Sequence, residues 1–195
     1  MSLTSALMLL FAAQSAPAIV TDCDRLAAHP NDPDRVTAGV SERLVDTTAA
    51  IAACKIAVAA EPANGRLNYQ LARALGYAGR GKEAAPHRDA AIKADYPQAL
   101  FVVGYIHLFG LNDAAQDACK AGDLIRRSAL KGRQAGLVGF PHWTLGGKFR
   151  GCAVKQDKAE MLDFLMQAKA QLNGDYYQTL LVEGLEARLS AAANN

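Results

Sequence analysis

The chain has 195 residues, a length that fits one ordinary domain. Its 21 Lys and Arg residues nearly balance 19 Asp and Glu residues, so the net charge of +2 gives no support for a nucleic-acid partner. The hydrophobic fraction of 51% excludes a disordered polymer, and the abundance of alanine favours closely packed helices over β-sheet.

Residues 1–18 have the pattern of a signal peptide. An apolar run at residues 7–13 is followed by Ala16-Pro17-Ala18, the small-x-small sequence typical of a signal-peptidase site. The run is shorter than the roughly 20 residues that a membrane-spanning helix needs. Because no Lys or Arg precedes it, a buried N-terminal helix is the alternative. We predict an exported protein, periplasmic or secreted from a bacterium, that is not an integral membrane protein.

Residues 19–64 predict an N-terminal pair of helices. A short first helix over about residues 22–28 ends before Pro30 and Pro33, because proline cannot continue a helix. A second helix over about residues 45–60 carries Ile51, Cys54 and Val58 on one face and ends before Pro62.

The four cysteines form an early and a late pair, with separations of 31 and 33 residues. None has the C-x-x-C spacing of zinc knuckles or thioredoxin-like redox sites. Of three possible pairings, the local one closes loops of about one helical repeat each. We therefore predict the disulfides Cys23–Cys54 and Cys119–Cys152, which agree with export. Four buried thiols in a cytosolic protein are the alternative.

Residues 65–172 contain a repeat of small and apolar residues. The copies are Ala99-x-x-x-Val103-Gly104-x-x-His107-x-x-Gly110, its counterpart Ala135-x-x-x-Gly139-Phe140-x-x-Trp143-x-x-Gly146, and the earlier Leu67-x-x-x-Leu71-Ala72-x-x-Leu75-x-x-Ala78. A second helix follows each copy, with small residues near positions 90, 128 and 168. Small residues allow antiparallel helices to approach closely, and a period in the thirties is typical of an α-solenoid. The fold predicted is all-α, an α/α solenoid of antiparallel helix pairs.

The C-terminal region, residues 173–195, predicts a capping helix with an apolar stripe at Tyr176, Leu180, Leu181, Leu185 and Leu189. The spacings Asp157-x-x-Glu160 and Asp175-x-x-Gln178 predict where the last two helices begin. Pro86 is expected in the first turn of a helix that starts near residues 82–83.

One short motif has the form of a catalytic site. Ser128 and Lys131 match the S-x-x-K motif of penicillin-recognising enzymes, in which the amine takes the hydroxyl proton. The companion motifs are absent, and Ser128 occupies a small-residue position of the repeat. The four histidines lack metal-ligand spacing, and no phosphate loop is present. We therefore predict no catalytic, metal or cofactor site, and a solvated helix face for the basic residues Arg126, Arg127, Lys131 and Arg133.

The pattern of residues 99–110, followed by Arg127-Ser128-Ala129-x-x-Gly132, resembles the Sel1-like repeat, a relative of the tetratricopeptide repeat. The resemblance is good over residues 99–132, fair over 65–96 and degenerate over 135–169. With its four cysteines, the chain resembles exported, cysteine-rich Sel1-like proteins of bacteria. The resemblance implies a concave surface formed by the first helix of each pair, with partner-binding candidates Arg66, Tyr69, Arg73, Phe101, Tyr105, Leu108 and Thr144.

These features predict a non-enzymatic exported scaffold or adaptor that binds a protein or peptide in the cell envelope. The alternative is a small-molecule binder or weak hydrolase acting on cell-wall or β-lactam ligands, which depends on Ser128 and Lys131. A structural module of a larger assembly is a third possibility, and it differs from the first only in how permanent the partner is.

Overall fold

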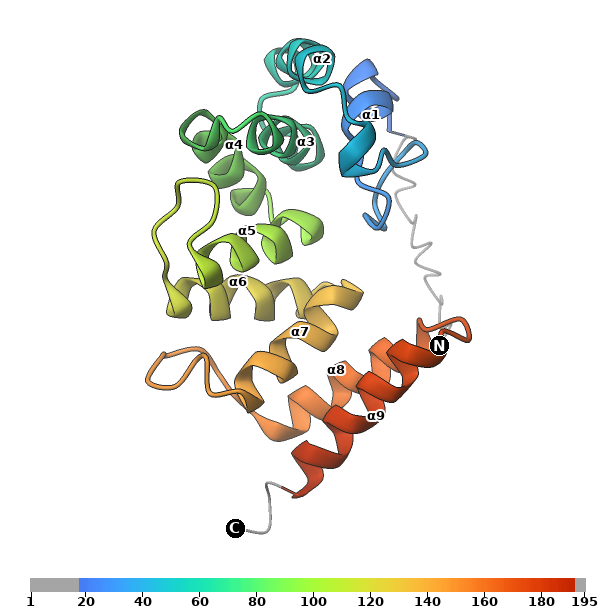
Figure 1. Cartoon of the computed structure of the whole chain (residues 1–195), viewed down its shortest axis with the longest axis vertical. Helices are drawn as coiled ribbons and strands as arrows, with labels where there is room; N and C mark the ends of the chain where they lie inside the picture. The colour runs from blue at the N-terminus through green and yellow to red at the C-terminus, as the bar shows by residue number, and fades with distance from the viewer. Residues whose placement is uncertain (1–17, 192–195) are drawn as a thin grey trace, which may run out of the picture.

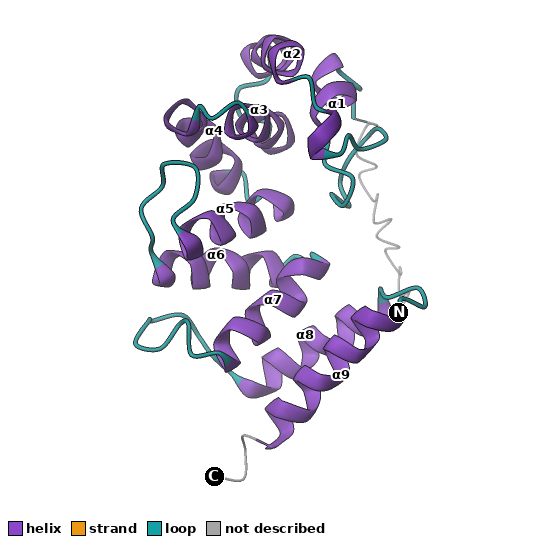
Figure 2. Ribbon diagram, viewed as in Figure 1, coloured by secondary structure: helices purple, strands orange, loops and turns teal. Residues whose placement is uncertain are grey.

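A computed structural model describes residues 18–191; the predicted signal peptide apart from Ala18, and the last four residues, lie outside this range. Within it the chain forms helices and no strand (Figure 2). The helices are α1 (Asp22–Ala27), a 3₁₀ turn η1 (Glu42–Leu44), α2 (Thr47–Ala60), α3 (Gly65–Tyr77), α4 (Gly81–Lys93), α5 (Pro97–Phe109), α6 (Ala118–Leu130), α7 (Gln134–Leu145), α8 (Lys158–Ala170) and α9 (Tyr176–Ala191). The all-α prediction is confirmed.

The helices follow one another along an arc (Figure 1). The pairs α3/α4, α5/α6 and α7/α8 each pack together, and consecutive pairs contact one another. The helix α9 packs on α8 and α7 and covers the end of the stack. This arrangement confirms the predicted α-solenoid of helix pairs. The first helices of the pairs, α3, α5 and α7, face the inner side of the arc.

Side-chain caps fix where several helices begin. Asp46, Asn64, Asp117 and Asp157 each accept a hydrogen bond from a backbone N–H in the first turn of the following helix. These bonds satisfy donors that have no partner inside the helix. The predicted cap at Asp157 is therefore present, and Asp175 likewise accepts from the backbone of Gln178 at 3.0 Å.

Glycines lie where helices cross, within a pair at Gly104, which is a position of the repeat pattern, and between neighbouring pairs at Gly136. A Cβ atom added at Gly104 of α5 would lie 2.6 Å from the Ile125 side chain of α6. One added at Gly136 of α7 would lie 2.6 Å from the backbone nitrogen of Ala129 in α6. Neither helix has room for a side chain at these crossings, so glycine sets the spacing of the stack.

Gly136→Ala is expected to lower the free energy of unfolding by about 1–3 kcal/mol, because backbone atoms of α6 cannot move aside for the new methyl group. Gly184→Ala in the middle of α9 is the matched control, since nothing lies within 4 Å of its added Cβ. The control should stabilise the protein by up to about 1 kcal/mol through helix propensity. Urea unfolding of both variants measures the difference, and equal effects would contradict the close crossing.

Both predicted disulfides are present. Cys23 of α1 joins Cys54 of α2 with a Cα–Cα distance of 4.4 Å, inside a core formed by α1, α2 and α3. Cys119, near the start of α6, joins Cys152 in the loop between α7 and α8 with a Cα–Cα distance of 5.1 Å. The first bridge is fully buried, whereas Cys119 is exposed at the surface. The second bridge therefore connects two consecutive pairs of the solenoid.

Two local predictions are corrected by the structure. The helix α4 begins at Gly81, so Pro86 lies in its second turn; the residue is exposed, and water can reach the carbonyl left without its usual partner. In α9 the buried stripe is Val182, Leu185 and Leu189, while Tyr176, Leu180 and Leu181 are exposed.

Candidate functional site

The inner face of the arc holds the residues that the sequence singled out as partner-binding candidates, but four of the seven are buried. Arg66, Tyr69, Arg73 and Leu108 are each less than 10% exposed. The expectation that these four lie on an open surface is therefore wrong. Leu108 belongs to the core cluster that includes Ile125 of α6, Tyr69 packs with Ala91 and Ala99 of α4 and α5, and Arg66 is covered by Asp24 of α1. Arg73 is covered by residues 28–46, a segment of largely irregular backbone that folds back from α1 beside α3 and α5 (Figure 1). We call residues 28–46 the covering segment.

Arg73 of α3 binds this segment through its backbone. Its guanidinium donates hydrogen bonds to the carbonyl oxygens of Ala27, Ala28 and Val40, at 2.9, 3.0 and 2.6 Å. Its Nε donates to the hydroxyl of Tyr77 at 3.1 Å. The two terminal nitrogens of this side chain thus hold backbone groups that lie more than 30 positions away in the sequence.

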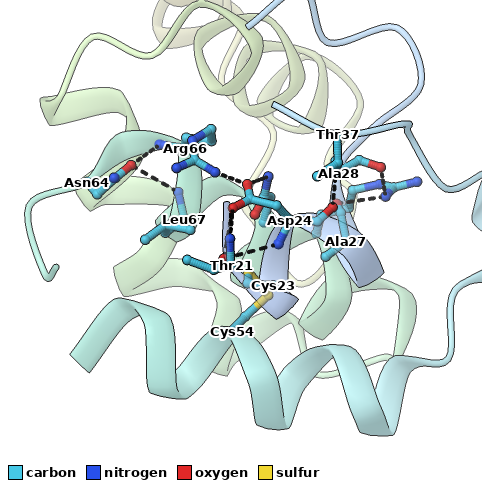
Figure 3. The surroundings of a disulfide bond; sticks show 12 residues. Thr21, Cys23, Asp24, Ala27, Ala28, Thr37, Cys54, Asn64, Arg66 and Leu67 are labelled. Carbon is cyan, nitrogen blue, oxygen red and sulfur yellow. Dashed lines mark hydrogen bonds and ion pairs between the residues drawn. A yellow bond between two sulfur atoms is a disulfide. The ribbon is translucent and has the colours of Figure 1, made fainter. Parts of the chain in front are cut away.

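Arg66 of α3 binds the carboxylate of Asp24 in α1, and both side chains are buried (Figure 3). Asp24 also accepts hydrogen bonds from the backbone and hydroxyl of Thr21, both at 2.8 Å, and from the amide of Gln70 at 3.0 Å. A buried carboxylate needs such a set of donors to remain charged. The pair fixes α1 on the inner face of α3.

A second polar network connects the covering segment with α5 and α7. The Tyr96 hydroxyl donates to the carboxylate of Asp32 at 2.7 Å. The amide of Gln98 donates to the Tyr69 hydroxyl at 3.2 Å and its oxygen accepts from the Nε of Arg133. Burial raises the pKa of Asp32 and of Tyr96, and lowers the pKa of Arg133.

Beyond the covering segment, the inner face remains open as a groove of about 740 Å³. One wall is the tip of the covering segment, which includes Asn31 and Arg35. The floor is formed by α5 and α7, with Phe101, Arg133 and Trp143. The opposite wall is the turn between α8 and α9 together with the start of α9, including Gln171 and Gln178. We call this feature the inner groove.

Aromatic rings cluster around Trp143, and two of them, Phe101 and Trp143 itself, line the inner groove. Trp143 lies 6.2 Å from Phe101 in a stacked arrangement, 6.0 Å from Tyr105 and 6.3 Å from Phe109, measured between ring centroids. A Cβ added at Gly139 would lie 2.7 Å from the Trp143 ring, so the absence of a side chain there lets the indole lie against α7. Tyr105 and Phe109 are each about 40% exposed. Clusters of this kind provide large, rigid contact surfaces.

The polar part of the groove is basic and rich in amides. Arg35 and Arg133 line it, and neither has a carboxylate within ion-pair distance among residues 18–191. The guanidinium of Arg133 lies 5.9 Å from the ring centre of Phe101, so charge and aromatic surface adjoin. The amides of Asn31, Gln134 and Gln171 offer both donors and acceptors.

The sequence anticipated part of this groove. Of the predicted partner-binding residues, Phe101 lines the groove and Tyr105 belongs to the same aromatic cluster, whereas Thr144 is half-buried and its hydroxyl has no hydrogen-bond partner in the described chain. Arg133 was expected on a solvated face but is 8% exposed. The repeat alignment placed Trp143 opposite His107 without assigning it to the inner face. Gly139, four residues earlier in the chain, leaves the space in which this ring packs on α7.

The remaining basic and S-x-x-K residues connect helices. Arg126 forms two hydrogen bonds of 2.7 Å with Glu160, and Arg127 pairs with Asp95. Lys131 also pairs with Asp95, and the Ser128 hydroxyl donates to the Pro97 carbonyl at 2.9 Å. The prediction of a solvated basic face holds for the exposed Lys131, whereas Arg126 and Arg127 are half-buried and Arg133 is buried, and within residues 18–191 all but Arg133 form ion pairs with residues of other elements. Structural roles account for both Ser128 and Lys131.

His29 gives the covering segment a pH dependence. Burial, with the nearby charges of Arg73 and Arg133, lowers the pKa of His29 to about 4 in the folded protein, from 6.5. Its Nδ1 accepts a hydrogen bond from the Asn31 backbone at 3.0 Å, which requires a neutral ring nitrogen. Below pH 6.5 the unfolded chain therefore takes up a proton that the folded chain does not.

We expect stability to fall as the pH is lowered from 6.5 towards 4, and His29→Gln to flatten this dependence. Burial also lowers the pKa of His87, so His29→Gln combined with His87→Gln should flatten it further. Urea unfolding at pH 7.0, 5.5 and 4.5 measures how the free energy of unfolding changes with pH. The same pH dependence in His29→Gln and the wild type would contradict a lowered pKa of His29.

The fold defines the class of this protein, an α-solenoid of helix pairs with two disulfides. No family model, no curated protein and no solved structure matches the chain. None of the helices in residues 18–191 is long and apolar enough to cross a membrane. Within the same range no group of His, Cys, Asp or Glu side chains is arranged to hold a metal ion.

Proposed function

We propose that this protein is an exported, non-enzymatic scaffold whose inner groove binds a polypeptide segment of another envelope protein. One observation carries the proposal: the inner face already binds a segment of largely irregular backbone, namely the chain's own residues 28–46. Arg73 holds that segment by the backbone carbonyls of Ala28 and Val40, a mode of contact that does not depend on the side chains of the bound segment.

The open groove continues the same face. By repeat spacing Phe101 occupies in α5 the position that Tyr69 occupies in α3, and Tyr105 occupies the position of Arg73. Arg73 is covered by the chain's own segment, whereas Phe101 lines the open groove and Tyr105 is 40% exposed. Aromatic and arginine side chains dominate the binding energy of many interfaces, which supports a macromolecular ligand here.

Family membership and location are part of the proposal. The helix pairs α3/α4, α5/α6 and α7/α8 coincide with the segments that resemble Sel1-like repeats, which supports a place in that family. Two disulfides support an oxidising compartment, the periplasm or the exterior of a bacterium.

Selection from a phage-displayed peptide library on the disulfide-intact protein tests the function. The selected peptides should bind Trp143→Ala at least tenfold more weakly than wild type, because the indole is the centre of the aromatic cluster. Tyr177→Ala is the matched control, since this ring is 81% exposed and lies outside the groove. Equal binding by wild type and Trp143→Ala would overturn the assignment of the groove.

A further inference from the structure

The charge of the inner groove restricts its ligand. Among residues 18–191 its lining contains two arginines, Arg35 and Arg133, and no Asp or Glu side chain. Acidic residues lie beside it: Asp32 and Asp34 in the covering segment, and Asp175, which accepts hydrogen bonds from the backbone and amide of the lining residue Gln178. Asp32 is buried and accepts from the Tyr96 hydroxyl and the Asp34 backbone, and neither Asp32 nor Asp34 forms an ion pair with either arginine. Two cations without a paired anion in a sheltered groove favour a negatively charged ligand.

The covered half of the inner face shows how it accommodates acid groups. The Asp24 carboxylate lies against Arg66 and Gln70 of α3, and the Asp32 carboxylate lies against Tyr96. Both are side chains inside a polypeptide rather than chain ends. By repeat spacing Gln98 and Gln134 follow Arg66 in α5 and α7, and Arg133 lies directly before Gln134. The open half therefore presents a similar combination of guanidinium and amide.

An apolar surface adjoins these arginines. The Arg133 guanidinium is 5.9 Å from the Phe101 ring centre, and Phe101 stacks on Trp143. Extended polypeptide advances about 3.3 Å per residue, so this separation corresponds to neighbouring or next-neighbouring residues of a bound segment. A single short segment is therefore able to contact the charged and the aromatic parts together.

We propose that the inner groove binds an internal segment in which an aspartate or glutamate lies one or two residues from an aromatic or large aliphatic residue. The carboxylate pairs with Arg35 and Arg133, and the apolar side chain packs on Phe101 and Trp143. This inference rests on the proposed function and specifies the chemistry of its partner.

The test uses hexapeptide libraries, acetylated and amidated at their ends, with random flanks around a fixed central pair. The central pairs are aspartate–phenylalanine, asparagine–phenylalanine, lysine–phenylalanine and aspartate–serine. The disulfide-intact protein should retain the first library at least tenfold better than each of the other three. The preference for aspartate over asparagine should weaken when salt is raised from 50 to 500 mM, because salt screens the attraction between charges. The Debye length falls from about 10 Å at 0.1 M to about 3 Å at 1 M.

Variants of the groove residues test which side chain causes each ligand preference. Arg35→Gln should reduce the preference for aspartate over asparagine by threefold or more, because Arg35 is exposed and contributes one of the two charges. Arg43→Gln is the control with the same change in net charge, and it should have no effect, since Arg43 is exposed outside the groove. Trp143→Ala should remove the preference for phenylalanine over serine.

The outcomes separate this inference from the proposed function. Binding that depends on Trp143 but is equal for aspartate and asparagine would overturn the acidic ligand and leave peptide binding intact. A fifth library, with a free C-terminal carboxylate, tests whether the groove binds a chain end instead. If the protein retains only this library, the proposal that the ligand is an internal segment is wrong. Absence of binding in every library, together with failure of the phage selection, would overturn both.

Discussion

Asp24→Ala is expected to lower the free energy of unfolding by about 3–5 kcal/mol, the range observed when one partner of a buried ion pair is removed. The change leaves the Arg66 guanidinium buried without its carboxylate and removes the acceptor for Gln70 and for the Thr21 hydroxyl. Because the same carboxylate caps α1, the helix itself also loses a stabilising contact.

Asp22→Ala is the matched control, since it removes another aspartate of the same helix whose side chain is 79% exposed. Its ion pair with Arg25 is at the surface, and the loss should not exceed about 1 kcal/mol. Urea unfolding of both variants provides the comparison. Hydrogen exchange should show faster exchange across residues 28–46 only in Asp24→Ala, and similar losses of stability in the two variants would contradict the role of the buried pair.

Replacing Cys23 and Cys54 together by alanine should cost about 4 kcal/mol. The chain-entropy estimate for a loop of 31 residues is about 3.7 kcal/mol, and the buried sulfur atoms add packing that alanine does not restore. The loop closed by Cys119 and Cys152 is nearly the same length, at 33 residues. Replacing Cys119 and Cys152 together by alanine therefore removes nearly the same loop-closure entropy but a less buried bridge. This variant should lose less stability than the variant without Cys23 and Cys54.

Mild reduction provides the second measurement. Thiol–disulfide exchange requires access to a sulfur atom, so Cys119–Cys152, with Cys119 exposed, should be reduced before Cys23–Cys54 at low concentrations of dithiothreitol. Alkylation and peptide mass mapping identify which thiols appear first. Earlier labelling of Cys23 and Cys54 would mean that α1 opens readily from α2 and would contradict their place in a closed core.

The sequence predicted the parts of this fold that depend on local periodicity. Small residues recurring every 32 to 36 positions indicated helix pairs, and Gly104 of this pattern lies at the close crossing of α5 and α6. The two disulfides followed from spacing, because each closes a loop about one repeat long. Asp157 and Asp175 predicted helix starts, since capping depends on residues only three positions apart.

The same reasoning explains the errors. The buried face of α9 depends on the orientation of this helix against α7 and α8. The periodicity of the α9 sequence does not contain that orientation, so it could not predict which of the apolar residues are buried. Arg133 resembles a solvated cation in sequence because its contact with Gln98 spans 35 residues. Motif position placed Arg66, Tyr69 and Arg73 on the inner face, but it had no information on what covers that face.

By itself, then, the sequence determined the helices, their pairing and the two cysteine bridges, because each depends on residues close in the chain or on a regular repeat. Tertiary structure decided which part of the inner face is free. Residues 28–46 lack periodicity, and their position depends on carbonyl groups that Arg73 binds from more than 30 residues away. The groove lined by Arg133, Phe101 and Trp143 exists because that segment stops at α5 and leaves α7 uncovered.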